Sequence, residues 1–387
     1  MAGQSISLVG TFMQTVGVSW LVYRLTNSEF SLGLFGFLTE LASVAVVLFA
    51  GVLADRSAPQ RMLLAAQTLA MLQAFALSLL VFTGHIDVAA VFALGCFLGM
   101  LNGMEAPARQ ALFPVVVADR NDLRSAVALY SLSLDAARMA GPALAGVVIA
   151  SRGEGWCFLA NGFSYLAVII ALISLRAEPR PCPAAGEDLV RSLATGIGYV
   201  SAHPFIRAII LLIVAVSFGG SAVAVLMPVM AAGVLKGGPE TLGVLMASLS
   251  LGALAGAFLL GMKNGGEGEL KILTGAGACL YGLAVAAFSH SSWLWLSVTL
   301  LMLAGLGIMV LMASANTFLL TEVEADKRGR VMSIFTLSFM GTVPFGSLCA
   351  GILAEHIGTP ATIAAGAAIC IIGALLFIGF TLRTEGV

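Results

Sequence analysis

The sequence predicts an all-α membrane protein whose twelve transmembrane helices form two pseudo-symmetric six-helix bundles. Three observations support this fold class: an extreme composition, twelve long apolar runs and a weak repeat between the halves of the chain. Of the 387 residues, 59% are hydrophobic and 10% are charged, against roughly 25% charged in a soluble domain. The mean hydropathy is +1.02. This composition excludes a water-soluble enzyme, a nucleic-acid-binding protein and a disordered chain.

Twelve runs approach the roughly 20 apolar residues that a helix needs to cross a bilayer. A β-barrel does not fit, because barrel strands alternate apolar and polar residues over about 10 positions. The first run is expected to be a spanning helix rather than a signal peptide, since no basic segment precedes it. Because Gly3 already lies at membrane depth, we expect a short cytosolic lead before Met1. The runs cover residues 2–23, 30–54, 62–83, 88–106, 123–150, 156–175, 205–228, 241–262, 271–289, 293–320, 331–354 and 361–382.

The distribution of Lys and Arg predicts the orientation. Counted from the N-terminus, the even-numbered loops and the C-terminal tail hold most of the 19 basic residues. The odd-numbered loops hold only Arg24, Arg152 and Lys236, and Arg138 falls inside a run. Basic residues are enriched in cytoplasmic loops. We therefore expect a multi-pass protein of the plasma (inner) membrane with both termini in the cytoplasm.

A repeat and a proline-rich segment divide the chain near its middle. The segment ADRNDLRS at 118–125 has a counterpart in ADKRGRVMS at 325–333, and GPALAG at 141–146 has one in GSLCAG at 346–351. We predict an N-terminal bundle at 1–175, a cytoplasmic linker at 176–203 and a C-terminal bundle at 204–387. Parallel repeats of this kind are typical of secondary transporters that bind substrate between the repeats.

The loop between the second and third runs reads GVLADRSAPQR. It resembles the signature loop of the major facilitator superfamily, Gly-x-Leu-Ala-Asp-Arg-x-Gly-Arg-Arg-Arg. MEAPARQALFPVVV at 104–117 and the KGGPETLGVLM run resemble the siderophore-exporter-like branch, which includes enterobactin-type exporters and drug-efflux relatives. The resemblance implies the major facilitator fold and transport by alternating access. The positions that match the signature loop are Gly51, Leu53, Ala54, Asp55, Arg56 and Arg61.

In such transporters this loop belongs to a charge cluster that closes the cytoplasmic side. An acid such as Asp55 at a helix C-terminus is disfavoured by the helix dipole unless it has a partner. Arg61 or Arg109 are candidate partners, and Glu105 is expected to join the same cluster with Arg109. Two simpler alternatives remain: the loop only fixes topology, and Glu105 and Arg109 form an ordinary surface pair four residues apart.

The segment GPALAG in the fifth run resembles the exporter signature of the superfamily. Its key positions here are Gly141, Pro142 and Gly146, while Ala128 and Ala137 stand where the fuller motif has glycines. Proline removes a backbone donor and bends a helix, and glycines allow close helix contact. The alternative is a kink without functional consequence.

Three ionisable residues lie in the middle of predicted helices: Glu40, Asp135 and Arg138. A charge at the bilayer centre costs about 2.5–3.5 kcal/mol or more, so such residues are functional candidates. Asp135 and Arg138 are three residues apart and share a helix face, where they can form a structural pair. Without a nearby cation, burial favours the neutral form of Glu40, which suits a proton carrier. We expect these three residues to couple proton and substrate movement.

The expected function is a proton-coupled secondary exporter of a small hydrophobic or siderophore-like molecule, acting as a monomer in the lipid bilayer. A lysophospholipid flippase is the nearest alternative, and a non-transporting membrane sensor or scaffold is the alternative from another class. No motif of a membrane-embedded enzyme, an ATP-binding loop or a metal site is present, so we expect no enzyme activity, cofactor, metal or nucleic-acid partner. Polar residues that can line the transport cavity are Thr11, Gln14, Asn102 and Asn316.

Overall fold

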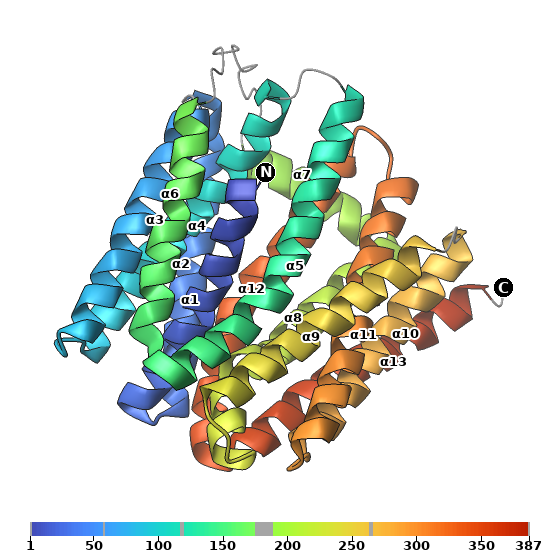
Figure 1. Cartoon of the computed structure of the whole chain (residues 1–387). Coiled ribbons are helices and arrows are strands. Elements are labelled where there is room, and N and C mark those ends of the chain that lie inside the picture. Colours follow the sequence, from blue (N-terminus) through green and yellow to red (C-terminus); the bar gives the residue numbers. More distant parts are fainter. Residues whose placement is uncertain (1, 57–58, 117–119, 175–188, 263–265, 386–387) are drawn as a thin grey trace. The chain divides into compact units, whose positions relative to one another are not determined.

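The computed structural model describes residues 2–56, 59–116, 120–174, 189–262 and 266–385. Within these ranges the side chains of residues 2, 48–56, 113–116, 120–124, 127–128, 189–194, 267 and 384–385 are not described. The described backbone consists of helices joined by short turns (Figure 1). Twelve of these helices are long and apolar enough to cross a membrane. The all-α fold class with twelve spanning helices is confirmed.

The chain divides into two compact units. The first comprises Met1–Ala185 together with Lys236–Ala247. In this unit α1 packs against α5 and α6, α3 packs against α4 and α6, and α2 packs against α4. Its spanning helices are α1 (Ala2–Thr26), α2 (Glu29–Arg56), α3 (Pro59–Phe82), α4 (Val88–Val116), α5 (Arg120–Arg152) and α6 (Glu154–Ser174).

The second unit comprises Gly186–Leu235 together with Ser248–Val387. In it α8 packs against α12 and α13, and α10 packs against α11 and α13. The short helix α7 packs against α12 and α8. The helices are α7 (Leu189–Ala202), α8 (Pro204–Val229), the π-helical turn η1 (Met230–Val234), α9 (Pro239–Gly261), α10 (Glu267–Ser289), α11 (Leu294–Glu322), α12 (Arg328–Ile357) and α13 (Thr359–Glu385).

The weak sequence repeat corresponds to the same packing in each unit. A Cβ added at Gly141 of α5 would lie 2.5 Å from the Cβ of Phe12 in α1. A Cβ added at Gly346 of α12 would lie 2.6 Å from the carbonyl oxygen of Phe218 in α8. These two glycines are the aligned positions of GPALAG and GSLCAG. Each therefore lets the fifth spanning helix of its unit approach the first.

The turns that follow these helices are also equivalent. Gly153 between α5 and α6 has φ +89°, and Gly358 between α12 and α13 has φ +84°. Left-handed backbone of this kind is easily adopted only by glycine, which explains why each helix ends where it does.

One segment of the predicted C-terminal bundle groups with the first unit. Lys236–Ala247, which covers the first turns of α9, groups with the first unit, although the sequence placed it in the second bundle. The reason is a close backbone approach to α5. A Cβ added at Gly243 would lie 2.5 Å from the carbonyl oxygen of Pro142. The predicted linker 176–203 contains α7, and its residues 176–188 lie outside the described chain.

Aromatic packing closes one end of the second unit. The Phe205 ring of α8 lies 4.9 Å from the Phe318 ring of α11 and 5.5 Å from the Phe377 ring of α13. The ammonium of Lys271 in α10 stands 4.8 Å from the centre of the Phe205 ring, within the range of a cation–π interaction. Four helices of the unit therefore meet at one aromatic centre.

Candidate functional site

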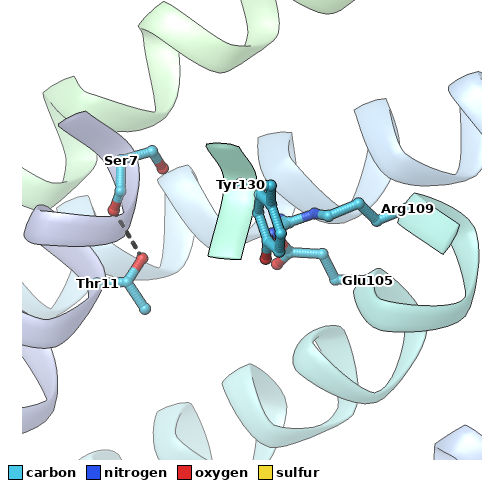
Figure 2. Close-up of polar contacts among 5 residues, drawn as sticks. All are labelled: Ser7, Thr11, Glu105, Arg109 and Tyr130. Atoms are coloured by element: carbon cyan, nitrogen blue, oxygen red, sulfur yellow. Dashed lines mark hydrogen bonds and ion pairs between the residues drawn. The ribbon is translucent and has the colours of Figure 1, made fainter. Parts of the chain in front are cut away.

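A polar stripe runs along α1 on the face that packs into the first unit. Gln4, Ser7, Thr11 and Gln14 recur at three- and four-residue intervals, so they lie on one side of the helix. Ser7 and Gln14 are buried, and the Thr11 hydroxyl donates to the carbonyl oxygen of Ser7 at 2.9 Å (Figure 2). This stripe connects two polar clusters described below.

The first cluster is an amide network buried in the unit. Gln14 Nε2 donates to Gln73 Oε1 at 2.9 Å, and Asn161 Nδ2 donates to Gln14 Oε1 at 2.8 Å. Gln73 Nε2 donates to the carbonyl oxygen of Leu94 at 3.1 Å, and Ser164 Oγ donates to Asn161 Oδ1 at 2.9 Å. The side chains tie α1, α3, α4 and α6 together.

Gln14, a predicted cavity candidate, lies in this network. Gln14 is 1% exposed and its amide is bonded on both sides, so it joins α1 to α3 and α6. Sequence reasoning did not single out Gln73 and Asn161. A weak sequence indication existed, because an amide side chain within an apolar helix commonly forms a hydrogen bond to a neighbouring helix.

The second cluster surrounds Arg109 of α4 (Figure 2). Its Nη2 pairs with the carboxylate of Glu105, one turn earlier on the same helix, and its Nη1 donates to the hydroxyl of Tyr130 in α5. The guanidinium carbon also stands 5.0 Å from the centre of the Tyr130 ring. With its amide oriented to satisfy both groups, Gln4 accepts from the two terminal nitrogens at 3.1 and 3.2 Å.

The Arg109 cluster agrees in part with the sequence-based expectation. Glu105 and Arg109 do interact, but their side chains are only 22% and 13% exposed. They are therefore not an ordinary surface pair. Sequence reasoning missed Tyr130 and did not connect Gln4 of the α1 stripe with Arg109, because nothing in the chain order links α4 to α5 or α1 at these positions.

The predicted cytoplasmic gate can be placed only in part. Gly51, Asp55 and Arg56 lie where side chains are not described. Arg61 is exposed in the first turn of α3 and has no ion-pair partner among the described side chains. A contact between Asp55 and either arginine therefore stays a prediction.

No ion pair joins the three intramembrane charges among the described side chains. Glu40 of α2 is exposed at the surface of the first unit, and Asp135 of α5 is partly exposed. Among the described side chains, Asp135 and Arg138 form no ion pair. The Arg138 guanidinium instead lies over the Phe12 ring of α1, 5.9 Å from its centre. A helix spacing of three residues permits an ion pair, but the long arginine side chain has reached an aromatic face.

The exporter-like segment of α5 packs tightly on both sides of its proline. Gly141 contacts α1, as described above, and Pro142 is buried. A Cβ added at Gly146 would lie 2.9 Å from the carbonyl oxygen of Pro239 and 3.2 Å from the Cα of Gly243. Side chains larger than hydrogen do not fit at either glycine without displacing backbone.

Among the other cavity candidates, Thr11 is partly buried in the stripe of α1, Asn102 of α4 is exposed and Asn316 of α11 is partly buried. An ion pair that sequence reasoning missed joins Arg24, near the end of α1, to the buried Glu154 at the start of α6. Within the described residues, no three His, Cys, Asp or Glu side chains come together as metal ligands.

The fold and these polar clusters define a polytopic helical membrane protein, and comparison with known proteins identifies it as a transporter. The transmembrane secretion effector family, MFS_3, matches residues 2–386. The chain therefore belongs to this family of the major facilitator superfamily.

Curated relatives cover nearly the whole chain. The staphyloferrin A transporter of Staphylococcus aureus (strain NCTC 8325 / PS 47) is 25% identical over 386 residues, covering 97% of this chain and 94% of the relative. The enterobactin exporter EntS of Shigella boydii serotype 18 is 28% identical over 381 residues, covering 96% and 89%. These relatives are transporters.

Solved structures show the same fold at lower identity. A bacterial homologue of the iron transporter ferroportin has a TM-score of 0.74 at 15% identity, covering 98% of this chain and 97% of the other. A bacterial homologue of the human lysosomal transporter Spinster has a TM-score of 0.70 at 14% identity, covering 98% and 93%. At these identities the likeness concerns the fold alone.

Proposed function

We propose that this protein is a proton-coupled secondary exporter of a siderophore-like small molecule that works by alternating access. The observation that carries the proposal is the family match over residues 2–386. Relatives that transport staphyloferrin A or export enterobactin, each aligned over nearly the whole chain, point to the substrate class. We place the protein in the inner membrane as a monomer with both termini in the cytoplasm.

The position of Glu40 supports proton coupling. Its side chain is exposed at the surface of the first unit, near the middle of an apolar helix. An ionised side chain that faced lipid there would cost about 2.5–3.5 kcal/mol, so we assign Glu40 to the water-accessible transport path. Asp135 is a second candidate, because Arg138 does not neutralise it in an ion pair. Protonation of either carboxylate would change the charge of the path.

Transport in inverted membrane vesicles from an efflux-deficient host tests this proposal. We expect vesicles that contain the protein to accumulate enterobactin or staphyloferrin A when a proton gradient is imposed. We expect Glu40→Gln or Asp135→Asn to reduce this uptake. Asp87→Asn is a matched control, because Asp87 caps α4 at the backbone N–H of Ala90 and asparagine caps equally well. Full proton-driven flux in both Glu40→Gln and Asp135→Asn contradicts the coupling. Flux of lysophospholipid in place of both siderophores supports the flippase instead.

The proposed orientation has its own test. His85 lies in the turn between α3 and α4, and Asp326 lies in the turn between α11 and α12. In intact cells a membrane-impermeant maleimide should label His85→Cys, while Asp326→Cys should be labelled only after the membrane is opened. Labelling of the unsubstituted protein measures the background that its native cysteines contribute. The reverse labelling pattern shows that the termini are outside.

A further inference from the structure

The guanidinium of Arg109 has one hydrogen-bond donor that nothing in the described structure satisfies. Its Nη1 donates to Tyr130, and its Nη2 meets Glu105. Gln4 accepts from both terminal nitrogens. The Nε is buried without any partner. Leaving a buried donor on a charged group unpaired is unfavourable, so this nitrogen marks a place where an acceptor is missing.

The missing acceptor lies on a defined edge of the guanidinium. Nε–H and one N–H of Nη2 point in the same direction, and together they match the two oxygens of a carboxylate. Glu105 contacts Nη2 but leaves Nε without a partner. Because Glu105 lies only four residues before Arg109 on the same helix, its side chain reaches the cation along the helix surface. An untethered ligand is free to approach this edge with both oxygens.

The surroundings favour an exchangeable anion over a permanent one. Arg109 and Glu105 retain 13% and 22% exposure of their side chains, while Nε itself is buried, so an anion can take this edge only as Glu105 moves away from Nη2. Figure 2 shows Tyr130 and Arg109 lying against each other, with Glu105 beside them. Tyr130 and Gln4 hold the guanidinium from other directions, and neither carries a charge that has to leave when the anion is replaced.

We propose that Arg109 anchors a paired-oxygen anion of the transported molecule, a carboxylate or a catecholate, and that Glu105 occupies this place when the molecule is absent. The inference rests on the proposed function and adds the residue and the chemical group that recognise the substrate. The arriving anion takes Nε and Nη2, and Glu105 is released. Arg109 is paired with one anion before and after the exchange, so its charge is never left unpaired. Ligands without a carboxylate or catecholate gain no binding affinity from this site.

Binding of two small probes to the purified full chain in detergent micelles tests the exchange. Citrate supplies carboxylates and 2,3-dihydroxybenzoate supplies catechol oxygens, so the two titrations show which anion the site takes. In Glu105→Gln the competing carboxylate is gone, and we expect the preferred probe to bind about tenfold more tightly. In Arg109→Lys the planar fork is lost while the charge stays, and we expect binding about tenfold weaker.

A second ion pair in the same unit provides matched controls. Arg24→Lys and Glu154→Gln change the Arg24–Glu154 pair in the same way, and neither should alter the affinity for either probe. If Glu105→Gln binds both probes no better than the unsubstituted protein, or if folded Arg109→Lys keeps the original affinity, the anion site is refuted. If Arg109→Lys does not fold, the probe affinity of Glu105→Gln alone decides whether the anion site exists.

The binding and transport measurements can fail separately. If the probes bind as expected while vesicles export no siderophore, the anion site stands and the proposed function fails. If siderophore export occurs while the probes respond to neither substitution, the proposed function stands and the anion site fails.

Discussion

Replacement of Gln14 by leucine tests whether the buried amide network holds the first unit together. Gln14 is bonded on both sides, to Gln73 and to Asn161. Leucine has a similar volume, so the substitution creates little cavity or overpacking. It removes both hydrogen bonds and leaves an oxygen of Gln73 and an N–H of Asn161 without partners. Those two side chains are 2% and 0% exposed, so bulk water cannot replace the lost bonds.

The magnitude follows from the number of bonds and their environment. A hydrogen bond between transmembrane helices contributes on average about 0.6 kcal/mol and at most about 1.7 kcal/mol. Leaving a buried partner unsatisfied costs about 1–3 kcal/mol in soluble proteins. Because an unfolded chain in a micelle also finds partners for these groups, we expect Gln14→Leu to lose about 1–2 kcal/mol of unfolding free energy.

Unfolding of the full chain by sodium dodecyl sulfate in mixed micelles, followed by circular dichroism, measures this loss. Gln67→Leu is the matched control. Gln67 also lies on α3 and is 1% exposed, but its Oε1 has no hydrogen-bond partner. Its replacement removes a buried unsatisfied acceptor, so we expect no loss or a small gain in stability.

A Gln14→Leu protein as stable as Gln67→Leu refutes the reasoning. That result means that the two bonds of Gln14 contribute no more to stability than a buried amide whose oxygen has no partner. A loss far above 2 kcal/mol also contradicts the estimate, because it requires a cavity or a rearranged helix that near-equal volumes do not predict.

Two further predictions use the same unfolding assay. A Cβ at Gly10 would lie 2.6 Å from Asn161 Oδ1, so Gly10→Ala should displace the amide and cost about 1–3 kcal/mol. Gly379→Ala is the control, because nothing lies within 4 Å of the new Cβ. It should leave stability unchanged or raise it by up to about 1 kcal/mol through helix propensity. Equal stability of Gly10→Ala and Gly379→Ala contradicts the close packing at Gly10. Arg24→Gln leaves the buried carboxylate of Glu154 without its cation and should cost about 1 kcal/mol or more. Adding Glu154→Gln should restore part of that loss, and a further loss in the double variant argues against the pair.

The helices could be predicted from sequence because membrane crossing requires only length and apolar character. The pseudo-symmetry was visible in the aligned Gly141 and Gly346, since close helix contact restricts a position to very small residues. The equivalent turn glycines Gly153 and Gly358 were not singled out, although their positive φ imposes an equally strict requirement.

The polar contacts between helices could not be predicted in the same way. Gln14, Gln73 and Asn161 come from three helices far apart in the chain, and only packing brings them together. The position of Arg138 over Phe12 could not be predicted for a related reason. Spacing along a helix says which side chains share a face, but it does not say what the neighbouring helix offers to a long arginine.

The chemistry of the amide network has a consequence for how the protein responds to pH. Amide groups neither gain nor lose a proton between the acidity outside a cell and that of its cytoplasm, unlike carboxylates or imidazoles. The bonds of Gln14, Gln73 and Asn161 therefore keep the same strength on either side of a proton gradient. The interior of the first unit is therefore stabilised by amides whose hydrogen bonds do not change with the proton gradient that drives the proposed transport. In the proposed mechanism the response to protons therefore falls to carboxylates such as Glu40 rather than to this network.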